Sequence, residues 1–184
     1  MSDSLFYWEK RTHLFERLVS QSKMNIFFLD LNPTLAAEYH CDKHVVKMIL
    51  ECAQLLYCAH WILDPLEVPT FAYKKTHINH PCSIWVRESI ENYEWLCDLA
   101  YALCKEFTFR YEKIHKTQYH IEWLLNNPPF NIPNTKMTQI RLAMPDEYKQ
   151  ENPINAYREF YRESKMKQRQ IVSYVKRPWP TFLL

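Results

Sequence analysis

The chain has 184 residues and a mass of 22.4 kDa, which is the size of one domain. It contains no glycine, and this excludes the G-x-G-x-x-G and Walker A phosphate loops and the G-x-S-x-G elbow. Hairpin turns that need glycine are excluded as well, so a mainly α-helical fold is predicted. The net charge of +2 is close to neutral, and any affinity for nucleic acid must therefore come from local clusters of cations.

Hydrophobic residues make up 47% of the chain, which is enough for a packed core. The N-terminus lacks the pattern of a secretory signal, and the longest apolar run, at residues 53–63, is interrupted by His60 and too short to cross a bilayer. We therefore expect an intracellular protein without a membrane partner. Cys52, Cys97 and Cys104 lie among apolar residues at helical spacing, which predicts reduced thiols in the core.

The first 23 residues are predicted to form an amphipathic helical arm in front of the domain. Residues 24–184 are expected to form one compact helical bundle. This bundle begins with a short apolar run at residues 25–30, which lacks a clear helical period and predicts a buried extended segment.

Three of the predicted helices begin at an Asn-Pro or His-Pro pair. The polar side chain can cap the helix there, and proline fits the first turn. The predicted helices cover residues 33–63, 81–111, 119–125 and 153–176.

The helix predicted at residues 33–63 carries one narrow stripe of reactive side chains. The stripe consists of His40, His44, Lys47 and Glu51, at i, i+4, i+7 and i+11, with Lys43 beside it. The opposite face is apolar and is expected to pack inward, which would leave the stripe accessible. Bases, an amine and a carboxylate within hydrogen-bond reach suit acid–base or nucleophilic chemistry, and a solvated helix face is the alternative.

Two further histidines, His77 and His80, precede the helix predicted to start at Pro81. A helix N-terminus favours an anion such as phosphate, so these imidazoles are candidate anion ligands, and His80 is also a candidate helix cap. Together with His40 and His44 they offer an alternative metal site, although the H-E-x-x-H pattern is missing. We expect no cofactor.

The helix predicted at residues 153–176 carries five cations on one face. These are Arg158, Arg162, Lys165, Arg169 and Lys176, and Arg177 and Trp179 follow them. Glu159 and Glu163 lie off this face and are not expected to neutralise it. Cations in a row beside an aromatic side chain suit phosphate and base contacts, which predicts nucleic-acid binding, with an ordinary solvated basic face as the alternative.

Several short motifs carry a resemblance to a known family. They are Asn25-Ile26-Phe27-Phe28-Leu29-Asp30, His40-Cys41-Asp42-Lys43-His44-Val45-Val46-Lys47, Asn79-His80-Pro81, Trp85-Val86-Arg87 and Ala156-Tyr157-Arg158. Over residues 24–179 the chain resembles phage-type proteins classed as pyrimidine-dimer DNA glycosylases, which are remotely similar to glycosylase/AP-lyases of the endonuclease V type.

This resemblance implies a DNA-repair enzyme that excises a damaged base and cleaves the strand by β-elimination through an amine nucleophile. It implies a monomer that acts on damaged or modified double-stranded DNA in the cytoplasm, including that of an infected host cell. Arg87 is a DNA-contact candidate within the shared motifs.

The resemblance also implies a nucleophile, and here the chain departs from the characterised enzymes. They use the α-amine of a processed N-terminal residue, assisted by a glutamate on the following helix, whereas the matching start Met24-Asn25 lies behind 23 residues. We therefore take Lys47 as the first candidate amine and Lys43 as the second, with Glu51 placed to move protons. The alternatives are a nucleic-acid-binding module without catalysis and a metal-dependent hydrolase with histidine ligands.

Overall fold

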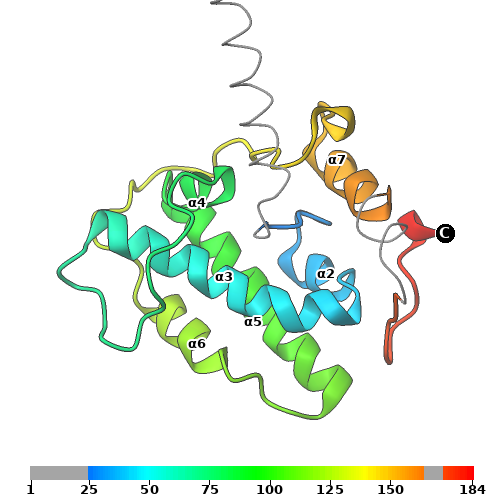
Figure 1. Ribbon diagram of the computed structural model, residues 1–184, viewed down its shortest axis with the longest axis horizontal. Coiled ribbons are helices and arrows are strands. Elements are labelled where there is room, and N and C mark those ends of the chain that lie inside the picture. The colour runs from blue at the N-terminus through cyan, green and yellow to red at the C-terminus, as the bar shows by residue number, and fades with distance from the viewer. Residues whose placement is uncertain (1–24, 164–171) are drawn as a thin grey trace, which may run out of the picture.

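The computed structural model describes residues 25–163 and 172–184, and within these ranges the chain forms six α-helices and no β-strand (Figure 1). The predicted mainly α-helical class is confirmed, and the predicted arm at residues 1–23 lies outside the described residues. The helices are α2 (Pro33–Glu38), α3 (Asp42–Leu63), α4 (Pro81–Val86), α5 (Ile90–Tyr111), α6 (Gln118–Asn126) and α7 (Pro153–Phe160), with 3₁₀ turns η1 (Asp146–Tyr148) and η3 (Thr181–Leu183).

The two longest helices, α3 and α5, lie side by side at the centre of the fold, as Figure 1 shows. Their apolar faces meet as predicted and bury Leu55 of α3 and Leu103 of α5 completely. All six cysteines are free and buried, which confirms the prediction for the thiols. By length and mean hydropathy alone α3 could also span a membrane, but 67% of its most apolar window is buried inside the protein, so core packing accounts for its composition.

The extended segment at residues 25–30 passes through the core, as the sequence predicts. Ile26, Phe28 and Leu29 are almost completely buried. The ring of Phe28 stacks on Trp95 with a centroid distance of 4.6 Å and meets the edge of Trp85 at 5.0 Å. These contacts fix the path of the segment against α4 and α5.

The helix predicted at residues 33–63 is in fact two helices, because residues 39–41 turn the chain between α2 and α3. Cys41 has extended backbone angles there, and its N–H donates to the hydroxyl of Tyr161 at 2.9 Å. The helix predicted at residues 81–111 is broken in the same way. Ser89 is extended between α4 and α5 and accepts a hydrogen bond from the N–H of Asn92 at 3.1 Å.

The helix predicted at residues 153–176 does not reach its predicted end, because residues 172–176 are not helical. α7 ends at Phe160, and residues 172–184, here called the C-terminal strap, return irregularly to the start of α3. The N–H of Asp42 donates to the carbonyl of Ser173 at 3.0 Å, and the Asp42 carboxylate accepts the N–H of Val175 at 3.1 Å. Burial by itself would raise the pKa of Asp42, but its hydrogen bonds hold this pKa below the usual value.

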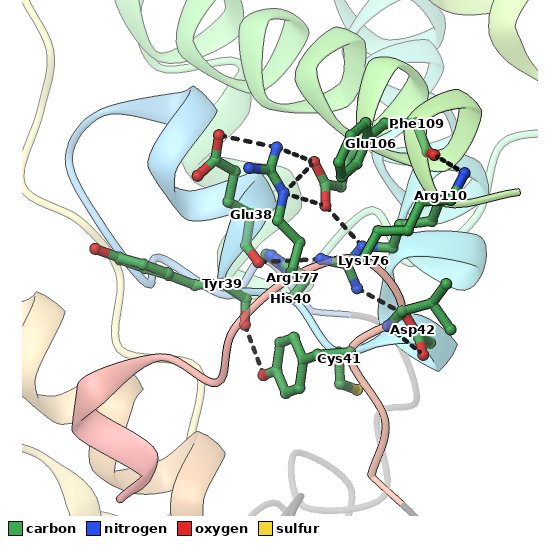
Figure 2. A network of polar contacts seen from close by, with 12 residues as sticks. Glu38, Tyr39, His40, Cys41, Asp42, Glu106, Phe109, Arg110, Lys176 and Arg177 are labelled. Atoms are coloured by element: carbon green, nitrogen blue, oxygen red, sulfur yellow. Dashed lines mark hydrogen bonds and ion pairs between the residues drawn. The ribbon is translucent and has the colours of Figure 1, made fainter. Parts of the chain in front are cut away.

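A buried ion network holds the strap to the bundle, as Figure 2 shows. Arg110 of α5 is completely buried and binds Asp42 at 2.8 Å and Glu106 at 2.6 Å. It also donates to the carbonyl of Glu38 at 3.0 Å. Arg177 of the strap binds the second oxygen of Glu106 at 2.9 Å and the carboxylate of Glu38 at 3.1 Å. The network thus joins α2, α3, α5 and the strap.

This network predicts a large loss of stability for Arg110→Met. The substitution removes the guanidinium, leaves Asp42 buried without its cation and leaves Glu106 with Arg177 alone. Breaking a buried ion pair in this way typically costs about 3–5 kcal/mol. Urea unfolding measures the change. Lys136→Met is the control, because Lys136 forms an exposed ion pair with Glu91 and its removal should leave the midpoint unchanged. Equal midpoints for the two variants would contradict a stabilising role for the network.

Candidate functional site

Glu51 lies on the face of α3 toward the extended segment, and only 6% of its surface is exposed. One carboxylate oxygen binds the amine of Lys47 at 2.6 Å. The other accepts the backbone N–H of Asn25 at 3.3 Å. A single buried carboxylate therefore contacts a lysine amine and the first backbone nitrogen of the extended segment.

The side chain of Asn25 connects Glu51 to the start of α4. Its amide nitrogen donates to the carbonyl of Ala143 at 3.0 Å, and its amide oxygen accepts the S–H of Cys82 at 3.3 Å. Burial raises the pKa of Cys82 to about 12, so the thiol keeps the proton that it donates. We call the group of Asn25, Lys47, Glu51, His80 and Cys82 the Asn25–Glu51 site.

His80 completes this site at the N-terminus of α4. Its Nδ1 accepts the N–H of Cys82 at 3.2 Å, which confirms the predicted role as a helix cap. Burial, with a smaller contribution from His77, lowers the pKa of His80 to about 4. The imidazole is therefore neutral at physiological pH, and because Nδ1 accepts, Nε2 carries the proton and can donate it to a ligand.

Among the predicted catalytic residues, Lys47 and Glu51 are in direct contact, and His80 is linked to them only through the hydrogen bonds of Cys82 and of Asn25, a residue absent from the predicted site. Asn25 is 26 residues from Glu51 and 57 from Cys82 in the chain, so helical spacing gives no signal for their contact. The sequence signal for this contact is the apolar run that follows Asn25. When that run is buried, its polar first residue is placed against a neighbouring element.

The prediction of an accessible stripe is wrong for His40 and Glu51, which are both buried. His40 lies in the turn before α3, where its Nδ1 donates to the carbonyl of Ala36 at 2.6 Å. Burial lowers the pKa of His40 to about 4, and its Nε2 has no hydrogen-bond partner among the described residues. His40 is buried and does not lie on the exposed face of α3, because the turn at residues 39–41 rotates it off that helix.

The remaining members of the stripe differ in their surroundings. His44 is half-buried, with its Nδ1 at 2.8 Å from the hydroxyl of Tyr161 and its ring stacked on Phe27 at a centroid distance of 5.1 Å. Lys43 and Lys47 are exposed on α3. Within the stripe, Lys47 and Glu51 form the ion pair at 2.6 Å that their i, i+4 spacing predicts.

The four histidines of the alternative metal site do not form a shared cluster. His77 is exposed, and its Nδ1 lies 2.6 Å from the hydroxyl of Thr76. Across residues 25–163 and 172–184, no three His, Cys, Asp or Glu side chains are arranged to hold a metal ion.

The predicted row of nucleic-acid-binding cations is not a single helix face, and Lys165 and Arg169 lie outside the described residues. Arg158 donates to the carbonyl of Leu29 at 2.7 Å and binds Asp30 at 3.0 Å. Arg162 pairs with Glu163 at 3.0 Å, so the expectation that Glu163 leaves the row unneutralised is wrong.

The cations of the strap are also engaged within the protein. Lys176 binds Glu112 at 2.7 Å and the carbonyl of Phe109 at 3.0 Å, and Figure 2 shows Arg177 between two carboxylates. Trp179 is half-exposed, with its ring 5.5 Å from that of Tyr174. The row is broken because the strap leaves the helical path after α7.

Arg87, the remaining predicted DNA contact, supports the loop that precedes α4. Its guanidinium donates to the carbonyls of Ile78 at 2.8 Å and Ser83 at 3.1 Å. It therefore ties the loop at residues 64–80 to α4 and helps to place His80.

Comparisons of the chain with protein-family models, curated proteins and solved structures give no match. Similarity therefore assigns neither a family nor an activity. The contacts around Glu51 are the basis on which a function can be proposed.

Three histidines with lowered pKa values predict a loss of stability in mild acid. Burial lowers the pKa of His40, His60 and His80 to about 4, below the ordinary value of 6.5 expected in the unfolded chain. Between about pH 6.5 and 4 the unfolded chain binds protons that the folded chain does not, so the free energy of unfolding falls as the pH falls through this window. Each histidine contributes a slope of up to about 1.4 kcal/mol per pH unit.

Urea unfolding at about pH 7, 6 and 5 checks this prediction. The variant His60→Gln removes one titrating group and keeps a side chain able to bond the hydroxyl of Tyr93, which lies 2.9 Å from His60. The free energy of unfolding of the variant should depend less steeply on pH than that of the wild-type chain. A stability that is flat from pH 7 to 5 in the wild-type chain would refute the assignment of neutral buried histidines.

Proposed function

We propose that the chain is a DNA glycosylase with AP-lyase activity, in which an amine beside Glu51 attacks the deoxyribose of a damaged or modified nucleotide in duplex DNA. The observation that carries the proposal is the position of the Glu51 carboxylate between the Lys47 amine at 2.6 Å and the Asn25 nitrogen at 3.3 Å. A buried carboxylate against an amine can accept a proton as the amine attacks and return it later.

The reaction uses the amine as a covalent catalyst. The amine nitrogen attacks C1′, and the electrons of the glycosidic bond leave with the base, which takes up a proton. The nitrogen loses a proton to Glu51, which passes it to O4′ as the C1′–O4′ bond breaks, and the sugar ring opens to a protonated imine that links the protein to C1′. Removal of a proton from C2′ then expels the 3′ phosphate by β-elimination, and water hydrolyses the imine to release the amine.

Lys47 is the nucleophile in this proposal. Its side chain is 48% exposed, so the amine can meet DNA while it contacts the buried carboxylate. Lys43 is exposed one turn earlier on α3 and does not contact Glu51 within the described part of the chain. The nitrogen of Asn25 is a peptide nitrogen, and cleavage of the chain before Asn25 would convert it into an α-amine beside the same carboxylate.

His80 supports the proposal as a donor at the same site. Its neutral ring presents an N–H group, and its place at the start of α4 is joined to Glu51 by the hydrogen bonds of Cys82 and Asn25. A donor of this kind can hold a phosphate oxygen or give a proton to the leaving base.

The proposal predicts that borohydride traps the protein on DNA that contains an abasic site. Lys47→Arg keeps the positive charge but cannot form the imine, so it should abolish trapping. Lys43→Arg is the matched control and should trap as the wild-type chain does. Glu51→Gln removes the proton acceptor and should slow strand cleavage by about 10²–10⁴-fold. Denaturing gels measure the adduct and the cleaved strand.

Mass spectrometry of the trapped peptide separates the remaining possibilities. An adduct on Lys47 supports the assignment, whereas an adduct on an α-amine at Asn25 keeps the lyase and replaces its nucleophile. DNA binding without any adduct favours the non-catalytic nucleic-acid-binding module. Cleavage that depends on added zinc or iron favours the metal-dependent hydrolase.

A further inference from the structure

Two large aromatic rings lie together on the surface beside α6. Phe71, in the loop at residues 64–80, is 44% exposed, and Tyr119 of α6 is 55% exposed. Their ring centroids are 6.2 Å apart. Single exposed apolar residues are ordinary on a protein surface, but adjacent exposed rings form a patch that can receive a ligand.

The core beneath holds these rings in place. The ring of Phe71 meets Trp123 edge-on, at 5.7 Å and 88°, and lies 5.8 Å from His120. Tyr119 lies 3.9 Å from the same histidine ring. His120 is itself buried, and its Nδ1 lies 2.9 Å from the hydroxyl of Tyr57. The exposed rings are therefore supported by a packed cluster, which lowers the entropic cost of stacking a ligand on them.

Three exposed lysines lie close in the chain to the two rings. Lys74 and Lys75 follow Phe71 in the loop, and Lys116 comes just before α6. The hydroxyl of Tyr73 lies 3.1 Å from that of Thr117, which brings the loop segment that holds Lys74 and Lys75 against the start of α6, next to Lys116 in the chain. None of the three forms an ion pair within residues 25–163 and 172–184.

The acidic residue of α6 does not cancel this charge. Glu122 is exposed one turn after Tyr119, and its carboxylate accepts the side-chain N–H of Gln118 at 2.8 Å. The loop at residues 64–80 carries one further exposed carboxylate, Glu67, four residues before Phe71, so lysines outnumber carboxylates near the rings in the chain. The local charge complements a polyanion even though the whole chain is close to neutral.

We propose that Phe71, Lys74, Lys75, Lys116 and Tyr119 form a binding surface for single-stranded nucleic acid, here called the aromatic–lysine surface. Bases stack on the two rings, and the phosphates on either side pair with the lysines. A single strand is the occupant because the bases of a duplex are stacked on one another and present no free faces. The inference does not depend on the lyase chemistry at Glu51.

The loop at residues 64–80 connects this surface to the Asn25–Glu51 site. It runs from the side of α6 up to α4, as Figure 1 shows, and its last residue is His80. Tyr73 ties it to Thr117 before α6, and Arg87 ties it to α4. A strand held on the aromatic–lysine surface would therefore lie along the segment that leads to His80.

Fluorescence anisotropy with labelled oligothymidylate, and with a duplex of equal length, tests the inference. Phe71→Ala and Tyr119→Ala should each weaken single-strand binding about tenfold, while Phe71→Trp keeps it. Phe130→Ala is the matched control, because Phe130 is 92% exposed and none of the ring contacts of Phe71 and Tyr119 within the described residues involves it. Phe71→Leu separates stacking from apolar contact, because it retains apolar area without an aromatic face and should bind as weakly as Phe71→Ala.

The salt dependence tests the lysines. Replacing Lys74, Lys75 and Lys116 together by Ala should reduce the slope of log affinity against log salt by about 2, since each phosphate contact on a single strand contributes about 0.7. The control, Lys136→Ala with Lys149→Ala, removes two lysines that already form ion pairs and should leave the slope unchanged.

Photocrosslinking of the wild-type chain to an oligonucleotide with 5-iodouracil gives a second readout that does not depend on a variant. Adducts on Phe71 or Tyr119 support the inference. Equal binding by Phe71→Ala and Phe130→Ala, wild-type affinity in Phe71→Leu, or an equal loss of duplex binding would overturn it. Borohydride trapping reports separately on the lyase, so failure of one proposal is distinguishable from failure of the other.

Discussion

A guanidinium that has no contact with solvent must have carboxylate and carbonyl partners, and Arg110 meets this requirement with residues from three parts of the chain. Asp42 is the first residue of α3, and Glu106 is one turn before Arg110 on α5. The carbonyl of Glu38 ends α2. The burial of one cation therefore sets how α2, α3 and α5 meet, and the second carboxylate oxygen of Glu106 is left for Arg177 of the C-terminal strap.

The same reasoning applies to the buried carboxylate of Glu51. It faces the extended segment from the middle of α3, and its two oxygens are satisfied by Lys47 and the backbone of Asn25. The apolar residues after Asn25 are held by aromatic contacts in the core, so the nitrogen of Asn25 has a fixed place. The packing of an apolar segment thus assembles a small group of polar atoms suited to amine chemistry.

Cations in this protein fall into two classes with different consequences. Arg158, Lys176 and Arg177 form ion pairs with Asp30, Glu112 and Glu106, and they contribute to the fold. Lys74, Lys75 and Lys116 are exposed in the described structure and form no such pairs there. The proposed aromatic–lysine surface draws on the second class, because neutralised cations add little to the local potential of a nearly neutral chain.

The local signals in the sequence predicted the helical class and three helix starts. α2, α4 and α7 begin at Pro33, Pro81 and Pro153, after the capping residues that the sequence suggested. The pairing of Lys47 with Glu51 could also be predicted, because residues at i and i+4 are neighbours on any helix. These features depend on nearest neighbours in the chain, and composition and spacing are sufficient to find them.

Helix breaks and the contact of Glu51 with Asn25 were decided by contacts between distant residues. The turn before α3 is held by Tyr161, 120 residues from Cys41, and the start of α5 is held by the carbonyl of Pro133 bonded to Ile90. The apolar period continues through both breaks, so periodicity predicts one helix where long-range hydrogen bonds make two.

The sequence by itself determined the helical class, several helix starts and the Lys47–Glu51 pair. Only the tertiary structure decided that His40 is buried, that the strap uses its cations internally and that Asn25 lies against Glu51, because each depends on which distant groups satisfy a buried charge or polar atom.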